Sequence, residues 1–195
     1  MRLLPFVQER GRKVVHLVSS IIPLGYWAVG PELGKPLLVL LVLAMALFEL
    51  ARMYLPRGRI LYKKFFGYVT RQHEYDRPSG ALYVFVGYLL AALLFTPAIA
   101  ILTMLFTSIG DTAAALIGQR YGKIRIGSKT LEGTLACFFV CLLLTIPSNL
   151  TLLASLTGAF TAAIAELIRW PFINDNLAIP VLSGAAITLV IAAGL

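Results

Sequence analysis

Apolar stretches long enough to cross a membrane follow one another along this chain of 195 residues. A membrane-spanning helix needs about 20 mostly apolar residues. On that scale the sequence predicts about seven spans, at residues 14–30, 35–55, 80–95, 97–118, 132–147, 150–169 and 177–195. Proline suits the first turn of a helix, so Pro97 after Thr96, and Pro36 after Gly34, mark expected helix starts. The chain is therefore expected to be all-α, a polytopic membrane helix bundle forming a single domain over residues 1–195.

The low content of charged residues supports an integral membrane protein. Only 13% of the residues are charged, whereas a soluble domain carries about 25%. The net charge of +8 does not by itself indicate nucleic acid, because basic loops of membrane proteins face the cytoplasm and anionic lipid headgroups. The sequence contains no nucleic-acid-binding motif, so membrane lipids are the expected surroundings, and nothing in it indicates an oligomeric state.

The charged residues define an orientation. With the N-terminus in the cytoplasm, every Lys and Arg except Lys35 falls in, or toward the ends facing, the cytoplasm, as the positive-inside rule requires. Every Asp and Glu except Glu32 falls on the same side, although acidic residues contribute little to that rule. Carboxylates and cations therefore converge on one membrane face, which predicts a cytoplasmic-facing site for a metal ion and an anion.

Residues 107–133 combine an intramembrane carboxylate with a basic, glycine-rich loop. Asp111 lies in an apolar helix, where an unpaired carboxylate costs about 2.5–3.5 kcal/mol at mid-membrane. The loop that follows interleaves cations with glycines, which suits a polyphosphate. Residues 122–130 are not a Walker A motif, because Ser128 intervenes before Lys129 and no strand precedes them. Asp111 is either a magnesium ligand or a structural ion-pair partner, and the basic loop is either a phosphate site or an ordinary cytoplasmic loop.

Other polar residues allow two interpretations each. Glu132 either caps the fifth span or binds ribose, base or metal. Glu49 with Arg52, and Glu166 with Arg169, form intrahelical pairs or line a reaction cavity. Asp175 and Asn176 either cap the last span or contribute a metal ligand. His16 is either an interfacial structural residue or a phosphate contact. Cys137 and Cys141 are expected to be buried free thiols, and residues 56–79 an interfacial amphipathic segment that contacts headgroups or guides a lipid.

Several motifs together resemble a known family. They are Asp111-Thr-Ala-Ala-Ala, Gly118-Gln-Arg-Tyr-Gly-Lys123, Lys129-Thr-Leu-Glu-Gly-Thr134, Asp175-Asn176 and Arg12-Lys-x-x-His16. This set resembles the CTP-dependent lipid-alcohol kinases, which include dolichol kinase, phytol kinase and the CTP-dependent diacylglycerol kinase. The resemblance implies transfer of the terminal phosphate of CTP to a long-chain alcohol (polyprenol, dolichol, phytol or diacylglycerol) with release of CDP.

Phosphoryl transfer needs Mg²⁺, cations on the phosphates and a group that orients or deprotonates the attacking hydroxyl. We expect Asp111 and Asp175 to hold Mg²⁺, with Glu166 as a further candidate ligand, and Asp111 or Glu166 to act on the hydroxyl. The expected nucleotide- and phosphate-binding residues are Arg125, Lys129, Thr130, Glu132, Gly133, Lys123 and His16. Glu49, Arg52 and Asn176 are expected to line the cavity.

Two other functions fit parts of the pattern. A CDP-lipid cytidylyltransferase is a related membrane enzyme, but its Pro-Gly-His-Gly-Gly run and its closing Asp-Arg-x-x-Asp are absent from this sequence. A small transporter keeps polar residues near the midplane, in broken helices and often in inverted repeats. Here the charges gather toward one face. The only sign of an internal repeat is that Glu49-x-x-Arg52 recurs as Glu166-x-x-Arg169.

Overall fold

A computed structural model describes residues 6–67, 77–168 and 173–195, and within them the chain is almost entirely helical. The predicted all-α membrane bundle is confirmed. The helical elements are α1 (Phe6–Val18), α2 (Ile21–Tyr54), α3 (Pro56–Phe66), α4 (Gly80–Leu94), α5 (Pro97–Leu105), the π-helical turn η2 (Phe106–Gly110), α6 (Asp111–Tyr121), α7 (Leu131–Thr145), the 3-10 turn η3 (Ile146–Ser148), α8 (Leu152–Leu167) and α9 (Asp175–Ala192).

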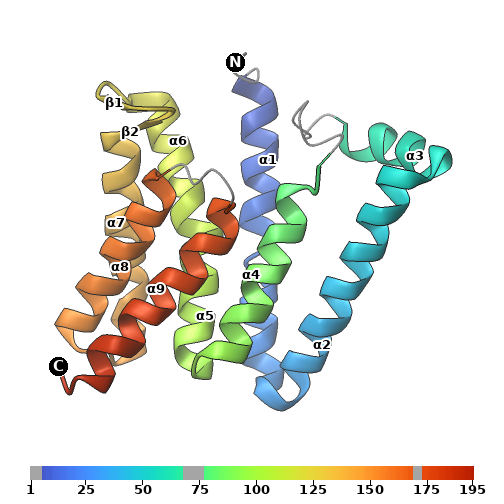
Figure 1. Cartoon of the computed structure of the whole chain (residues 1–195). Coiled ribbons are helices and arrows are strands. Elements are labelled where there is room, and N and C mark those ends of the chain that lie inside the picture. The colour runs from blue at the N-terminus through green and yellow to red at the C-terminus, as the bar shows by residue number, and fades with distance from the viewer. Residues whose placement is uncertain (1–5, 68–76, 169–172) are drawn as a thin grey trace.

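The chain reverses direction inside α2. Gly30 has a φ of 76°, a left-handed conformation that glycine adopts without steric cost. The first arm of α2 continues the path of α1, and the second arm returns beside it toward α3 (Figure 1). A Cβ at Gly34 would overlap the ring of Tyr26 on the first arm, so this glycine allows the two arms to pack closely. The prediction that the second span starts near Gly34 and Pro36 is therefore wrong, because both residues lie inside the returning helix.

The apolar helices follow the predicted spans closely. Four helical segments are long and apolar enough to cross a membrane, at Gly11–Tyr54, Pro97–Tyr121, Leu131–Ser148 and Asp175–Ala192. Gly80–Leu94 and Leu152–Leu167 are shorter apolar helices. The first segment contains the reversal at Gly30, so it accounts for the first two predicted spans. The predicted break at Thr96 is confirmed, since Thr96 precedes α5 and Pro97 lies in its first turn. The number of membrane crossings stays a prediction.

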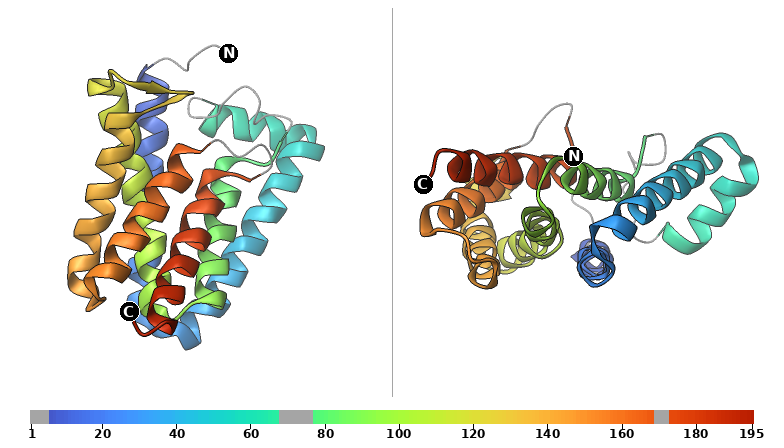
Figure 2. Two further views of the ribbon diagram at one scale, coloured as in Figure 1. Left: turned by 60° about the vertical axis from the view of Figure 1, so that its left-hand side comes forward. Right: turned by 90° about the horizontal axis from the view of Figure 1, so that it is seen from below.

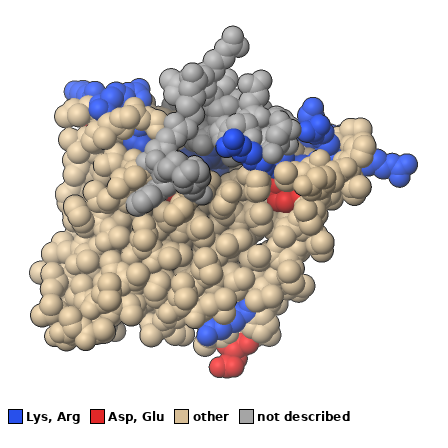
Figure 3. Space-filling view, viewed as in Figure 1, with Lys and Arg blue, Asp and Glu red and all other residues tan. Residues whose placement is uncertain are grey.

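The helices form a bundle with a polar end. The hairpin described below, the start of α1 and α3 lie at one end, and the C-terminus lies at the other (Figures 1 and 2). Lys and Arg side chains gather along the end that carries the hairpin and α3 (Figure 3). Helix α3 lies across this end and forms the first part of the segment 56–79 (Figure 1). Its interfacial role stays a prediction, and residues 68–76 of the segment lie outside the described residues. The bundle thus separates an apolar body from a basic end.

A short hairpin replaces the loop predicted between the fourth and fifth spans. Strand β1 (Arg125–Ile126) pairs antiparallel with β2 (Lys129–Thr130), and Arg125 lies opposite Thr130. Gly127 in the turn has a φ of 61°, which favours glycine. The hairpin brings Lys129 back to the start of α7. This local pairing was not predicted, because strands of two residues carry no periodic pattern.

The glycines that flank the hairpin allow α6 and α7 to pack closely. A Cβ on Gly133 would lie 2.6 Å from the carbonyl oxygen of Ala114. A Cβ on Gly118 would lie 2.7 Å from Oγ1 of Thr130. Small residues are the usual means by which membrane helices approach each other. Gly118 and Gly133 therefore have a packing role, whereas a Cβ added at Gly127 would have no atom within 4 Å. The approach of a ligand to the backbone of this segment stays a prediction.

Replacing Gly133 with alanine is expected to destabilise the bundle by about 1–3 kcal/mol, the usual range for overpacking. The added methyl group would collide with backbone, which cannot rotate away. Gly25→Ala is the matched control, because a Cβ on Gly25 meets nothing within 4 Å. Thermal unfolding in detergent compares the two variants. Equal melting temperatures would contradict the close packing of α6 on α7.

Candidate active site

Asp111 is the centre of the candidate site. It begins α6 directly after η2, and only 2% of its surface is exposed. Its Oδ2 atom lies 2.5 Å from Nζ of Lys13 and 3.2 Å from Nε2 of His16. Nε2 of His16 also lies 2.9 Å from the carbonyl oxygen of Thr107 in η2. Single π-helical turns inside α-helices are frequent at functional sites. This turn contains Thr107 and ends directly before Asp111, and His16 of α1 contacts both residues.

Lys13 is the residue that sequence reasoning did not assign. It is 5% exposed and donates to Asp111 from the N-terminal helix. The Arg12-Lys-x-x-His16 motif contained a signal for Lys13. Lys13 and His16 are three residues apart, so they lie on the same face of a helix. Lys13 and His16 therefore reach the same carboxylate, and the cost of burying Asp111 is offset by two partners rather than one.

A second group of charges comes from the hairpin, α8 and α9. Nζ of Lys129 donates to Oε1 of Glu166 and lies 3.4 Å from Oδ2 of Asp175. Glu166 is 2% exposed, and its buried Oε2 atom has no hydrogen-bond partner within the part of the chain that the structure describes. Burial alone would lower the pKa of Lys129, but the carboxylates of Asp175, Asp111 and Glu166 together raise it above its ordinary value. Lys129 is therefore a fixed cation among three acids.

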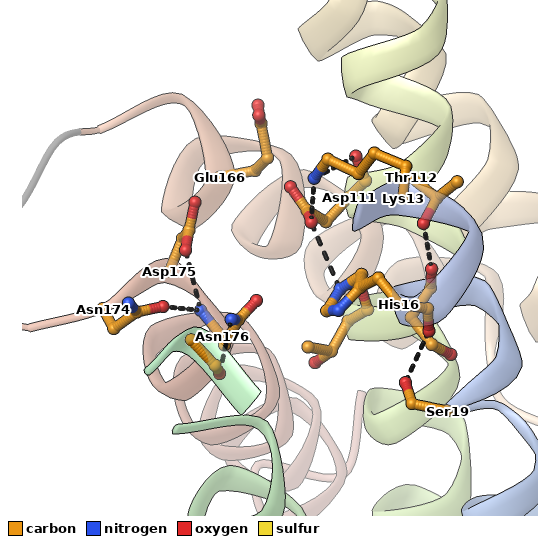
Figure 4. Close-up of polar contacts among 12 residues, drawn as sticks. Lys13, His16, Ser19, Asp111, Thr112, Glu166, Asn174, Asp175 and Asn176 are labelled. Atoms are coloured by element: carbon orange, nitrogen blue, oxygen red, sulfur yellow. Dashed lines mark hydrogen bonds and ion pairs between the residues drawn. The ribbon is translucent and has the colours of Figure 1, made fainter. Parts of the chain in front are cut away.

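The two groups face one polar centre. Figure 4 shows Lys13, Asp111 and His16 on one side, and Glu166 and Asp175 on the other. We call these five residues together with Lys129 the carboxylate centre. Its members come from α1, α6, β2, α8 and α9, which are distant in sequence. The structure therefore brings together both predicted catalytic acids, both predicted metal ligands, and two of the predicted phosphate-binding residues.

The start of α9 is capped by a residue that the sequence analysis did not name. The side chain of Asn174 accepts from the N–H of Asn176 at 3.0 Å, and Oδ1 of Asp175 accepts from the same N–H at 3.1 Å. Nδ2 of Asn176 donates to the carbonyl oxygen of Gly80 at 3.0 Å. Asn176 thus joins α9 to α4, and Asp175 keeps Oδ2 directed to Lys129.

Within the described ranges, no group of three or more His, Cys, Asp or Glu side chains is close enough to hold a metal ion by itself. Lys13 and Lys129 contact the carboxylates instead. The assignment of Asp111 and Asp175 as magnesium ligands stays a prediction.

The remaining loop residues have identifiable structural contacts. Glu132 accepts from the backbone N–H groups of Lys123 at 2.9 Å and Ile124 at 3.1 Å, which fixes the start of the hairpin. Oγ1 of Thr130 accepts from the N–H of Gly133 and caps α7. Lys123 and Arg125 are exposed at the basic end. A ligand-binding role for Thr130, Glu132 and Gly133 stays a prediction, whereas the exposed cations are accessible to an anion.

Glu49 and Arg52 form a different polar cluster. Arg52 donates to Oε2 of Glu49 at 2.5 Å and to the carbonyl oxygen of Arg77 at 2.7 Å. Its guanidinium carbon lies 4.7 Å from the centre of the Tyr62 ring. Within the described part of the chain, these contacts join the end of α2 to α3 and not to the carboxylate centre. The structure thus does not support their expected place in the reaction cavity. The other predicted pair includes Arg169, which lies outside the described residues.

Truncating Arg52 is expected to destabilise the fold by about 3–5 kcal/mol, because it leaves a buried charge without its partner. Arg52→Met should therefore lower the melting temperature strongly. The double variant Arg52→Met with Glu49→Gln removes both charges and is expected to recover much of the loss. Thermal unfolding of both variants in detergent measures the difference. A double variant no more stable than Arg52→Met would refute this account.

The two thiols lie next to Gly110, the residue before Asp111. Cys137 and Cys141 are buried and free, and their Sγ atoms are 3.9 Å apart. A Cβ on Gly110 would lie 2.6 Å from Sγ of Cys141. The prediction of two buried free thiols is confirmed, and both pack against the residue that precedes Asp111.

Comparison with known proteins identifies relatives over nearly the whole chain. The CTP-dependent diacylglycerol kinase 1 of Saccharomyces cerevisiae is 28% identical over 216 residues, covering 94% of this chain and 73% of the yeast protein. An uncharacterized protein of Rickettsia prowazekii is 27% identical over 193 residues, covering 92% of this chain and 93% of that protein. The dolichol kinase of Saccharomyces cerevisiae is 43% identical over 84 residues, covering 37% of this chain and 16% of that kinase. No family model matches the chain, and no solved structure matches it.

Proposed function

The chain is related over most of its length to CTP-dependent lipid kinases, and from that premise we propose that it transfers the terminal phosphate of CTP to the hydroxyl group of a long-chain lipid alcohol. CDP is the second product. The acceptor belongs to the class of polyprenol, dolichol, phytol or diacylglycerol. The observation that carries the proposal is the carboxylate centre, where the buried Lys13, the half-buried Lys129 and three acids from distant elements meet at the basic end of an apolar bundle.

The phosphates of the nucleotide bind at Lys129, with Arg125 and Lys123 on the same hairpin segment and His16 contributed by α1. Lys129 already holds a position between the acids of α8 and α9, and cations at fixed positions favour the charge of a polyphosphate. The exposed Arg125 and Lys123 lie on the hairpin segment and raise the local positive potential. This supports a nucleotide that approaches from the basic end.

The acids fit a magnesium ion that is bound together with the nucleotide. Mg²⁺ in such sites is usually held by one or two carboxylates plus the substrate phosphates. Asp111 and Asp175 supply hard oxygen donors, and Glu166 supplies a buried oxygen without a partner among the described residues. The bound ion would neutralise charge on the transferring phosphoryl group. In the structure these acids pair with the cationic side chains of Lys13 and Lys129. This supports a site that can bind a cation when the nucleotide arrives.

Asp111 or Glu166 orients or deprotonates the attacking hydroxyl. Oδ2 of Asp111 already contacts both Lys13 and His16, whereas Oε2 of Glu166 has no hydrogen-bond partner among the described residues. Both acids stay candidates for this role. In this proposal the lipid tail lies against the apolar helices and its hydroxyl rises to the polar end.

The proposed reaction has a direct test with purified protein in detergent, Mg²⁺, a panel of lipid alcohols and each of the four nucleoside triphosphates. We expect a phosphorylated lipid with CTP and with one or more of the alcohols. Equal product from ATP would refute the assignment of CTP. No phosphorylated lipid from any alcohol, with folded protein, would refute the kinase proposal.

The site faces the cytoplasm in this proposal, because the basic residues gather at the end that carries it. The native thiols are buried, so a cysteine placed at the exposed Ser128 reports orientation. Ser128→Cys should react with a membrane-impermeant maleimide in inverted cytoplasmic vesicles and not in intact cells. Labelling in intact cells would place the hairpin outside.

A further inference from the structure

A pocket of about 600 Å³ opens beside the carboxylate centre. It is lined by Ile126, Gly127 and Ser128 of the hairpin turn and by Leu167 and Ile168 at the end of α8. Each wall adjoins a member of the carboxylate centre, since Ser128 precedes Lys129 and Leu167 follows Glu166. Because Lys129 and Glu166 are ion-paired, the two walls of the pocket meet at the carboxylate centre.

The size and lining of the pocket suit the nucleoside part of a nucleotide. Small-molecule sites are commonly about 300–1,000 Å³, mostly apolar with a few polar groups. Isoleucine and leucine side chains from both walls can contact the faces of a base. The Gly127 turn leaves its backbone open, with no atom within 4 Å of a built Cβ, and Ser128 adds a hydroxyl. These groups can reach the polar edge of a base.

The position of the pocket argues against a lipid tail as its occupant. The hairpin lies at the basic end of the bundle, beyond the apolar body of the helices (Figure 1). The neighbouring hairpin residues Lys123, Arg125 and Ser128 are exposed. An aqueous nucleotide reaches this end directly, whereas an alkyl chain would leave the apolar body to enter it.

We infer that the pocket between the β1–β2 turn and the end of α8 binds the base and ribose of CTP while Lys129 binds its phosphates. The inference rests on the proposed function, because CTP is the assigned donor. It adds a second wall, formed by Leu167 and Ile168, that neither the hairpin motif nor the comparisons assign. It also gives the end of α8 a role in binding the donor, next to the proposed role of Glu166 in the carboxylate centre.

The test uses Ile126→Trp, whose larger side chain would fill the pocket, and Ile124→Trp as the matched control. Ile124 is 56% exposed on the same segment and does not line the pocket. Ile126→Trp should raise the dissociation constant of CTP by about tenfold or more, a loss of one base contact, and leave that of inorganic tripolyphosphate unchanged. Ile124→Trp should change neither. Unchanged CTP affinity in Ile126→Trp, or an equal loss for both ligands, would overturn the inference.

A photoreactive CTP with the reactive group on its base gives a second measurement that does not depend on a variant folding. We expect the cross-linked peptides of the unaltered protein to contain residues 126–128 or 167–168. Cross-links confined to other residues would overturn the inference. If the unaltered protein fails to transfer phosphate from CTP, the proposed function fails. If it transfers phosphate but cross-links elsewhere, only the pocket assignment fails.

Discussion

Asp111→Asn is expected to lower turnover by about 10²- to 10⁴-fold, the range found when a positioned acid–base group is removed. Asparagine keeps the size of the side chain but loses the charge that pairs with Lys13 and His16. In the proposed function, the variant would also lose a ligand for magnesium. Phosphorylated lipid formed per minute by purified protein measures the effect, at saturating CTP and lipid alcohol.

Glu32→Gln is the matched control for this change. Glu32 is exposed near the turn at Gly30, at the end of the bundle opposite the carboxylate centre. Its neutralisation should leave turnover within about twofold, because surface charges more than a Debye length from a site act on it weakly. Normal turnover by a folded Asp111→Asn protein would remove Asp111 from the chemistry.

Lys129→Ala is expected to weaken CTP binding by about 10- to 100-fold, because hydrogen bonds to charged groups contribute roughly 1.5–3 kcal/mol. The variant removes the cation that lies among Glu166, Asp175 and Asp111 and leaves those acids to repel the phosphates. Equilibrium binding of CTP in the absence of lipid alcohol measures the loss. Lys129→Arg should retain part of the affinity, since arginine also pairs with phosphate.

The control for Lys129→Ala is Lys35→Ala, a lysine in the segment after the Gly30 turn. It removes the same charge from the opposite end of the bundle and should leave CTP affinity unchanged. Thermal unfolding establishes that both proteins are folded before binding is compared. Retained CTP affinity in the folded Lys129→Ala variant would remove the phosphate-binding role of this residue.

Much of the helical architecture could be predicted because apolar length and local breaks determine it. Pro97 ended one helix and began the next as expected. The first predicted span ends at residue 30, where the chain reverses, but the start of the returning helix was placed too late, at Gly34 and Pro36. Gly34 serves packing and not the turn, since it passes the ring of Tyr26.

Several residues of the site could be predicted, because a charged side chain in an apolar segment is costly and therefore informative. Asp111 and Glu166 each stood out from apolar neighbours, and Asp175 was named with Asn176 before the last span; the structure brings all three acids to one centre. The partner of Asp111 was not predictable from spacing alone, because Lys13 is 98 residues away and reaches it only after α1 packs beside α6. The same limit explains Glu49, whose pairing with Arg52 looked like that of Glu166 but belongs to the α2–α3 junction.

The measurement that tests the central claim most directly follows the fate of labelled CTP. Purified protein receives Mg²⁺, a lipid alcohol and CTP that carries the label on either its terminal or its innermost phosphate. The account predicts that the terminal label enters the lipid fraction and the innermost label stays in CDP. Innermost label in the lipid fraction would show a cytidylyltransferase and would contradict the kinase assignment.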